Sequence, residues 1–308
     1  MINLVFIGTI INYTALFMTA AIGSCISLKT GDLNLGGEGQ IYTGGFLTAI
    51  ILSSFSSETF NTLPSFIPVF IALFTSILAG GIITLISALF KQYRNTDFLL
   101  TSFIISAAIC PLIDGLIAGP FRYTKGNLLA TSFISQRYRF TRLFPPSAIN
   151  LYIIAAILLC ILAWLFFKKT QFGKQIIIYG KSKEYLLYTG VSEKKIVFSS
   201  AFFSGGLHAL TGAMAILGMY YTCHSGFSAG MGWSALSVAL IAKSNPLLVI
   251  PVSFFISCLV NTANQIALFN NFDFDISSLI QGIILFIISI PVLKKENSAK
   301  ASEKKESK

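Results

Sequence analysis

The sequence predicts an all-α fold, a polytopic bundle of transmembrane helices, on two observations. The first is composition: of 308 residues, 54% are hydrophobic and 11% are charged, and the mean hydropathy is +0.76. Soluble domains carry about 25% charged residues, so a soluble fold could not bury this much apolar surface. The second is patterning, because the apolar residues gather in runs, and a bilayer-spanning helix needs roughly 20 of them. We therefore expect a multi-pass membrane protein.

The apolar runs set the predicted elements, which form one transmembrane domain over residues 1–293 with about 8–10 membrane segments. The first run has no basic residues before it and is too long for a cleaved signal, so we expect a retained helix. The run at 230–243 is shorter than the roughly 17 residues needed to cross alone. It is expected to be a half-helix or part of a broken span. The runs lie at roughly 2–28, 36–54, 64–90, 98–119, 148–167, 196–222, 230–243, 246–269 and 276–293.

The basic residues between the runs orient the chain. The positive-inside rule places three basic segments in the cytoplasm: the lysine-rich loop 168–195, the pair Lys91 and Arg94, and the tail 294–308. These placements are mutually consistent if the runs 230–243 and 246–269 count as two crossings, and the N-terminus is then outside. Loop 120–147 disagrees, because it carries five basic residues and no acid yet falls outside. The tail is too polar to bury a core, so we expect a disordered Lys-rich cytoplasmic segment. The net charge of +10 lies in short loops, which excludes nucleic acid as an expected partner and leaves membrane lipid.

A glycine-rich stretch, GDLNLGGEGQIYTGG over Gly31–Gly45, lies between the first two runs. Irregular backbone at membrane depth is tolerated only where it packs in protein or lines a cavity, and transporters use such breaks at substrate sites. Asn34 is well placed to cap a helix that begins near Gly36, and the helix dipole favours Glu38 in its first turn. Capping, contact with a translocated solute and close helix packing all remain open. The candidate residues for a translocation pathway or helix entry are Asn34, Gly36, Gly37, Glu38, Gly39 and Gln40.

Two further features concern helix entry and packing. A second glycine-rich entry, His224–Pro246, leads into another helical run, and two such entries hint at an internal structural repeat. Small residues over Ser204–Gly218 predict a flat face for tight helix packing, with Gly205, Gly206 and Gly212 as its contacts. His208 beside that face is expected to be a satisfied core or interface residue. The five cysteines show no metal-binding or disulfide spacing.

Loop 168–195 is too long for a simple turn and predicts a short helix over residues 183–189. Ser182 would cap this helix and Gly190 would close it. Its apolar side chains favour two interpretations equally, a docking element for a soluble partner and an amphipathic helix lying on lipid. The candidate docking residues are Gly180, Ser182, Glu184, Tyr185, Leu186, Tyr188 and Gly190.

Three stretches in this order resemble the permease subunits of bacterial ABC importers for simple sugars and nucleosides, a family that includes ribose-type and branched-chain amino-acid permeases. They are GDLNLGGEGQIYTGGF, the segment GKSKEYLLYTGV with its following helix, and GFSAGMGWSALSVALIAKSNPL. The resemblance implies a type II-like fold in the bacterial cytoplasmic (inner) membrane. It also implies a second permease in a hetero- or homodimer, a cytoplasmic ABC ATPase docked at 180–191, and an external solute-binding protein or lipoprotein.

The chain departs from the family pattern at several positions. Ile177 and Ile178 replace the usual Arg-Ala, Ser182, Leu186 and Leu187 replace the usual Asn and Ala-Ala, and Ile105 replaces an Asn. If that Asn lines the path elsewhere in the family, this subunit contributes a less polar wall, as one half of a heteromeric pair.

Import of a nucleoside or simple sugar is the function that the resemblance implies. The chain has no GxxxxGK[ST] motif, so no cofactor is expected on it and ATP is used by the partner ATPase. We find no catalytic triad and expect no enzymatic activity. The alternative is an ion-coupled secondary transporter of a small neutral solute, for which Asp114 and Glu38 are the candidate acids. A structural or scaffold membrane protein is a third possibility.

Overall fold

A computed structural model describes residues 4–55, 64–145 and 147–270, together with residues 279, 282, 283, 286 and 287. The chain divides into two units, Met1–Ser257 and Cys258–Lys308, and the arrangement given below is that of the first. The predicted run at 276–293 lies largely outside the described residues, and the predicted tail at 294–308 lies entirely outside them.

Six helices in the described part of the chain are long and apolar enough to cross a membrane, and these residues contain no strand. The predicted all-α, multi-pass fold is therefore confirmed. Helix α8 continues into one π-helical turn, η3, over Ile216–Tyr220. The six helices are α1 (Leu4–Lys29), α3 (Phe66–Arg94), α4 (Phe98–Ala118), α5 (Tyr152–Lys169), α8 (Glu193–Ala215) and α10 (Pro246–Phe269).

Further helices lie between these spans along the chain. Helix α9 has 11 residues, which at 1.5 Å per residue gives about 16 Å and cannot cross a bilayer alone. This length agrees with the half-helix predicted at 230–243. The remaining elements are α2 (Gly37–Ser54), the 3₁₀ turn η2 (Gln136–Tyr138), α6 (Gln171–Lys181), α7 (Lys183–Tyr188) and α9 (Met231–Ile241).

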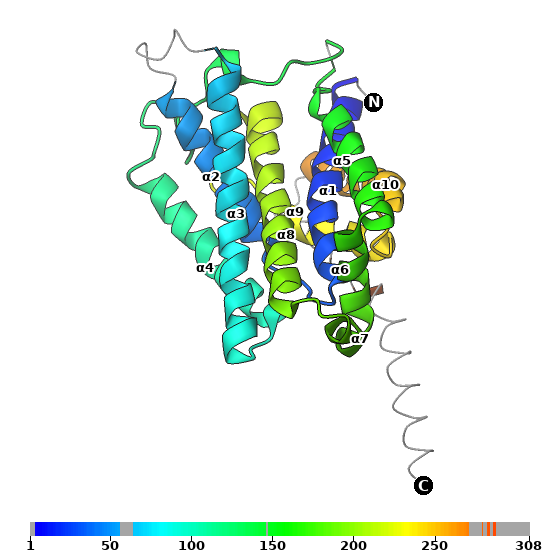
Figure 1. The fold of residues 1–308 in the computed structure, drawn as a ribbon. Helices are drawn as coiled ribbons and strands as arrows, with labels where there is room; N and C mark the ends of the chain where they lie inside the picture. Colours follow the sequence, from blue (N-terminus) through cyan, green and yellow to red (C-terminus); the bar gives the residue numbers. More distant parts are fainter. Residues whose placement is uncertain are drawn as a thin grey trace. The chain divides into compact units, whose positions relative to one another are not determined.

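Helix α8 is the centre of the bundle and packs against α1, α2 and α3, as Figure 1 shows for α1 and α3 on its two sides. Its predicted small-residue face makes these contacts. A Cβ atom at Gly205 would overlap Thr84 and the Gly80 carbonyl of α3, and one at Gly212 would overlap the Ile41 carbonyl of α2. Gly206 is less crowded, since a Cβ there would meet Ile77 at 3.0 Å. Close approach of small residues is how helices associate without a hydrophobic driving force.

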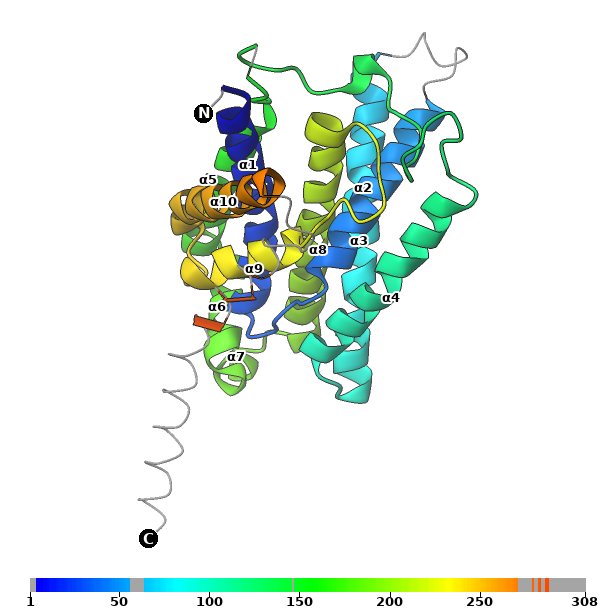
Figure 2. The same cartoon turned by 180° about the vertical axis from the view of Figure 1, so that it is seen from behind.

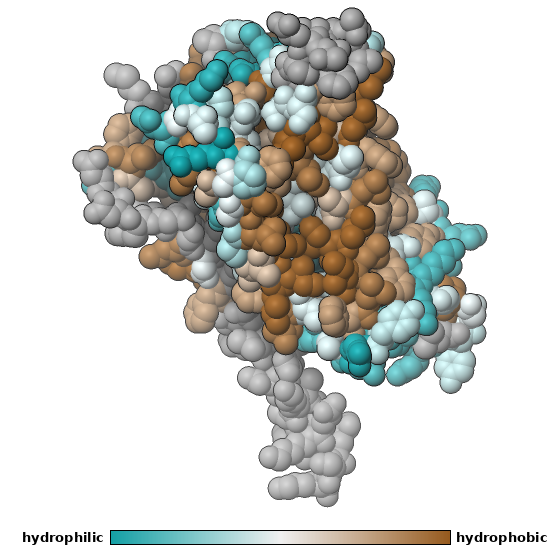
Figure 3. Space-filling model, turned by 90° about the vertical axis from the view of Figure 1, so that its left-hand side faces the viewer, coloured by the Kyte–Doolittle hydropathy of each residue, from teal (hydrophilic) through white to brown (hydrophobic). Residues whose placement is uncertain are grey.

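The two ends of the bundle differ in what they carry (Figure 1). The start of α1 and the connection between α4 and α5 lie at one end, and the α3–α4 turn, α6 and α7 lie at the other. The segments predicted to face the cytoplasm, at the end of α3 and over residues 168–195, thus share one end, and the basic loop 120–147 lies at the other. We call these the cytoplasmic end and the outer end, after the predicted orientation. Figure 3 shows hydrophobic side chains gathered across the middle of one face, with hydrophilic ones towards its ends.

Candidate functional site

The connection between α1 and α2 folds back into the bundle beside His208 of α8. The imidazole is fully buried; its Nδ1 lies 2.9 Å from Gln40 Oε1 and donates to it, and its Nε2 lies 3.1 Å from Ser24 Oγ and accepts from it. Ser24 stands five residues before the end of α1, which is about 8 Å along the helix. Helix α2 therefore begins inside the bundle, beside His208, and not level with the end of α1. Residues 30–36 form the re-entrant segment that precedes it.

Side chains satisfy the irregular backbone of this re-entrant segment. The Ser102 hydroxyl accepts a hydrogen bond from the Leu35 amide at 3.1 Å, and the Ser106 hydroxyl accepts one from Gly39 at 2.7 Å. Asn34 Oδ1 accepts from the Gly36 amide at 2.9 Å. Backbone groups at membrane depth need such internal partners, because hydrocarbon offers none.

Asn34 and Gln40 form a reciprocal pair of side-chain amides. Asn34 Nδ2 donates to Gln40 Oε1 at 3.1 Å, and Gln40 Nε2 donates to Asn34 Oδ1 at 3.2 Å. Asn34 also donates to the Ser204 hydroxyl of α8 at 3.0 Å. Both amides are buried, so these two predicted pathway residues fix the α2 entry to α8.

Glu38 connects the two glycine-rich entries, Gly31–Gly45 and His224–Pro246. Its carboxylate oxygens accept hydrogen bonds from the amides of Gly230, at 2.9 Å, and Gly232, at 2.8 Å. These amides form the start of α9, where the helix dipole favours a negative charge. Gly232 packs so closely that a Cβ atom on it would lie 2.5 Å from the Glu38 amide nitrogen. The sequence predicted that the dipole of its own helix, α2, stabilises Glu38. The structure adds a second stabilising contact, with the amides at the start of α9.

A second polar cluster lies on α4 around Asp114. Its Oδ1 accepts hydrogen bonds from the Tyr42 hydroxyl and from Ser225 Oγ, the latter at 2.6 Å. The Tyr42 hydroxyl in turn accepts from the Gly226 amide at 3.0 Å. Asp114 is half-buried, and Ser225 and Gly226 are exposed. The segment that carries them passes beside α2 on its way from α8 to α9, with α4 on the other side of α2 (Figure 2).

We define the α4–α9 face by Glu38, Asp114, Ser225, Phe103 and Trp233. Phe103 and Trp233 form an edge-to-face pair with ring centroids 6.3 Å apart. Phe103 precedes Asp114 by 11 residues on α4, which places the aromatic pair about 16 Å nearer the cytoplasmic end. Carboxylates in a membrane almost always face a bundle interior or a water-filled cavity. This face therefore has the chemistry of a surface that meets water or another protein.

The predicted docking segment forms helix α7 at the cytoplasmic end. Ser182 Oγ accepts from the Tyr185 amide at 3.4 Å, and Gly190 has the left-handed conformation (φ +77°) that closes a helix. Leu186 is 1% exposed and belongs to the core, whereas Tyr185 and Tyr188 are 61% and 92% exposed. Leu186 therefore packs α7 against the core, whereas Tyr185 and Tyr188 lie exposed on its surface.

The remaining docking candidates sit around this helix. Gly180 lies against the end of α1, where a Cβ atom would overlap the Lys29 carbonyl, and Glu184 is exposed. Ion pairs join neighbouring elements here, Lys91 with Asp32 and Lys183 with Glu193, the second at 2.7 Å. Burial raises the pKa of the Asp32 carboxyl, against the opposing effect of the Lys91 ammonium bonded to it.

Several site residues carry no signal in the sequence. Ser102 and Ser106 of α4 and Ser24 of α1 look like ordinary small residues of apolar helices, and only the fold brings them to Leu35, Gly39 and His208, respectively. No group of three or more His, Cys, Asp or Glu residues in the described ranges could hold a metal ion.

Residues 6–289 match the family described as branched-chain amino acid transport system / permease component. The chain is similar to the probable riboflavin import permease protein of Treponema pallidum (strain Nichols), with 34% identity covering 92% of this chain and 74% of the relative.

Two further relatives are more distant. The guanosine ABC transporter permease protein NupP of Bacillus subtilis (strain 168) is 23% identical, over 77% of this chain and 67% of the relative. The nucleoside ABC transporter permease protein of Lactococcus lactis subsp. cremoris (strain MG1363) is 22% identical, over 96% of this chain and 84% of the relative. No solved structure matches the chain.

Proposed function

Because the chain belongs to the family of branched-chain amino acid transport system permease components, we propose that it is one half of an ATP-driven importer for a solute that joins a planar ring to a hydroxylated chain or sugar. It is a multi-pass protein of the cytoplasmic membrane and an ABC transporter permease component for nucleosides or similar substrates. The choice of solute, the path and the docked partners are the parts that we propose.

The solute class rests on the names of the relatives together with the α4–α9 face. One relative is named for riboflavin and two for guanosine or nucleosides, and these molecules share a heteroaromatic ring bonded to a ribityl chain or ribose. The α4–α9 face presents one group for each part. The Phe103–Trp233 pair offers aromatic surface for a ring, and Asp114 with Ser225 offers acceptor oxygens for hydroxyls. Riboflavin is the first solute to test, because the similarity to its named permease is the highest of the three.

The path would run along the α4–α9 face, which a second permease subunit would cover. Glu38 and Asp114 are partly exposed on it, and leaving carboxylates against lipid is costly. The exposed backbone at Ser225 and Gly226 needs the same shelter, because lipid-exposed irregular loops do not occur in the hydrocarbon layer. A second permease subunit, with an aqueous path between it and this chain, would keep lipid away from both the carboxylates and the exposed backbone.

The cytoplasmic ATPase would dock on α7. Tyr185 and Tyr188 project from a helix that Leu186 anchors in the core, so a force on the tyrosines reaches the bundle through a packed contact. A movement there would pass to the end of α1 at Gly180. The tight contacts of α8, at Gly205 with α3 and at Gly212 with α2, would carry it further into the bundle. Such rigid transmission is how small shifts become alternating access.

The external solute-binding protein or lipoprotein would meet the opposite end. A polar pocket of about 440 Å³ lies there, lined by Arg139, Arg142, Gln136, Thr141, Phe140 and Tyr221. Two arginines, Arg139 and Arg142, line this pocket, so an acidic side chain of the delivering protein would form charge-assisted hydrogen bonds there. This function gives the basic residues of loop 120–147 a reason to lie outside despite the positive-inside rule.

The observation that carries the proposal is the family match over residues 6–289 together with the 34% identity to a named riboflavin permease. Its test is uptake by proteoliposomes that contain this chain, its candidate second permease, ATPase and binding protein. We expect ATP-dependent uptake of radiolabelled riboflavin or guanosine that glucose does not compete. Uptake that proceeds without ATP and collapses with a protonophore would instead support the ion-coupled alternative.

A further inference from the structure

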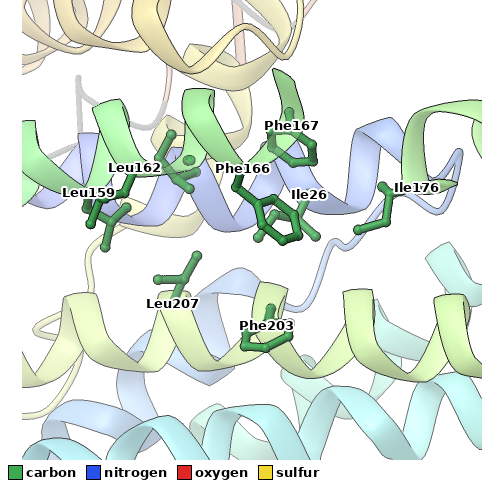
Figure 4. A pocket seen from close by; sticks show the side chains of 10 residues that line it. Ile26, Leu159, Leu162, Phe166, Phe167, Ile176, Phe203 and Leu207 are labelled. Atoms are coloured by element: carbon green, nitrogen blue, oxygen red, sulfur yellow. The ribbon is translucent and has the colours of Figure 1, made fainter. Parts of the chain in front are cut away.

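An apolar pocket opens between α1, α5, α6 and α8, away from the α4–α9 face (Figure 4). Its volume is about 320 Å³, within the roughly 300–1,000 Å³ of ligand pockets. All of its lining side chains are hydrocarbon. Phe166 and Phe203 point into it from α5 and α8, and Ile26 lies at its base (Figure 4). A ligand that fills this pocket must be apolar over its whole length inside it.

The pocket extends over the cytoplasmic half of the bundle. Its lining residues on α5 run from Leu159 to Phe167, which is eight residues or about 12 Å of helix. One leaflet of a bilayer has a hydrocarbon depth of about 15 Å. Phe167 is followed directly by Lys168 and Lys169 at the end of α5, so the pocket ends where the inner headgroup layer begins.

Cationic side chains stand at that end of the pocket. Lys29 Nζ lies 4.9 Å from the ring centroid of Phe167, a residue that lines the pocket. Lys168 Nζ lies 4.6 Å from the ring of Trp164 on the same helix. Within the described ranges the ion pairs are those of Lys91 and Lys183, so neither Lys29 nor Lys168 has an acidic partner among those residues. Lys169 and Lys174 are exposed nearby at the α5–α6 junction.

We infer that this pocket binds a phospholipid with an anionic headgroup from the cytoplasmic leaflet. One acyl chain would fill the space between α5 and α8, and the phosphate would accept hydrogen bonds from Lys29 and Lys168. Lysines near a membrane surface attract anionic lipid, and Trp164 has the interfacial position typical of membrane proteins. A soluble protein partner could reach the lysines but could not occupy a hydrocarbon-lined pocket inside the bilayer.

The site touches the elements that the proposed mechanism moves. Ile26 of α1 and Ile176 of α6 both line it, and α6 leads directly into α7. A chain wedged between α5 and α8 would hold α6 in place against α8. The bound lipid is therefore expected to support ATPase-driven uptake, while its binding does not depend on which solute is carried.

The test uses the two tryptophans of the chain. In a Trp233→Phe background the remaining tryptophan is Trp164, which lies on α5 between the pocket residues Ala163 and Phe166. Lipids with brominated acyl chains quench nearby tryptophan, so nanodiscs are prepared with brominated phosphatidylglycerol or brominated phosphatidylcholine at the same fraction. We expect stronger quenching by phosphatidylglycerol. In Lys29→Gln/Lys168→Gln that preference should fall by about fivefold for each lysine removed.

The matched control is Lys194→Gln/Lys195→Gln, which removes two lysines at the cytoplasmic start of α8, outside the pocket lining. This variant should keep the full preference. A second variant, Ala163→Phe, fills the pocket without changing charge and should lower quenching by both lipids. Equal quenching by the two lipids in the parent protein would overturn the proposal, as would equal effects of the two lysine pairs. Binding is read without transport, so a wrong solute would leave this result unchanged.

Discussion

Glu38 Oε2 accepts a hydrogen bond from the Gly232 amide at 2.8 Å, across 194 positions of the sequence. The contact joins the start of α2 to the start of α9, and Glu38 Oε1 adds a bond to Gly230. The first turns of these two helices are thus tied to each other by hydrogen bonds. The carboxylate satisfies amides that neither helix nor lipid could satisfy.

Replacing Glu38 with Ala should lower both stability and transport. The change leaves two partly buried amides without partners, and each hydrogen bond to a charged group is worth about 1.5–3 kcal/mol. We expect a lower midpoint of thermal unfolding in detergent and little uptake. The control is Glu184→Ala, which removes an exposed acid. Equal unfolding midpoints for the two variants would show that Glu38 does not hold α9.

Gly212→Ala should destabilise the protein far more than Gly206→Ala. A Cβ atom at Gly212 overlaps the Ile41 carbonyl, whereas one at Gly206 meets Ile77 at 3.0 Å and needs only a small adjustment. Overpacking of this kind costs about 1–3 kcal/mol. The measurement is the fraction of protein that stays monodisperse in detergent after heating. Equal losses would contradict the assigned contact between α8 and α2.

Asp114→Asn should weaken uptake without removing its dependence on ATP. The amide keeps an oxygen for Tyr42 and Ser225 but loses the charge that would bind solute hydroxyls. We expect a several-fold higher half-saturating solute concentration and no change with a protonophore. Asp97→Asn is the control, because Asp97 caps α4 by accepting from the Leu99 amide at 3.0 Å and lies at the cytoplasmic end. If Asp97→Asn has the same effect, Asp114 has no special place on the path.

Arg139→Gln with Arg142→Gln should reduce stimulation by the external binding protein. Both arginines line the polar pocket of the outer end, and an acidic partner would lose its charge-assisted bonds there. The measurement is the ATPase activity of the reconstituted complex against the concentration of solute-loaded binding protein. Basal activity should stay the same while the half-stimulating concentration rises. An unchanged curve would exclude this pocket from the docking surface.

The sequence predicted the spans well because their signal is local. Long apolar runs identify α1, α3 and α5 without knowledge of their neighbours. The short cap of α7 was also local, since Ser182 and Gly190 lie within a few residues of the helix. The partners of Glu38 and His208 could not be predicted, because their contacts lie far apart in sequence and depend on where α2 and α9 begin. Leu186 shows the same limit, since the pattern alone did not separate its buried position from that of the exposed tyrosines.

The sequence did not predict which residues of α3 and α2 pack against α8. Small residues on α8 indicated a tight face, but Gly80 and Gly44 look like ordinary glycines of apolar runs. Only the packing shows that Gly80 meets Gly205 and that Gly44 meets Ala209. The sequence also did not separate the buried candidate pathway residues from the partly exposed ones. Asn34 and Gln40 are buried in a hydrogen-bonded network, and Glu38 and Asp114 lie on a partly exposed face.

Tyr185→Asp with Tyr188→Asp should uncouple the ATPase while the protein still inserts and folds. Both side chains are exposed, so the change removes apolar contact surface for a partner without opening the core. We expect loss of ATPase copurification and of uptake. Tyr93→Asp is the matched control, an exposed tyrosine near the end of α3 at the same end of the bundle. Normal copurification by the double variant would contradict the docking assignment.

The most direct test of the account places a photo-crosslinking amino acid at position 188 in the intact complex in nanodiscs. Tyr188 is the most exposed aromatic residue of α7. Illumination should give one major adduct, with the cytoplasmic ATPase, and its yield should change between ATP-bound and nucleotide-free complex. Adducts with lipid alone in both states would contradict the claim that this helix is where the ATPase drives the permease.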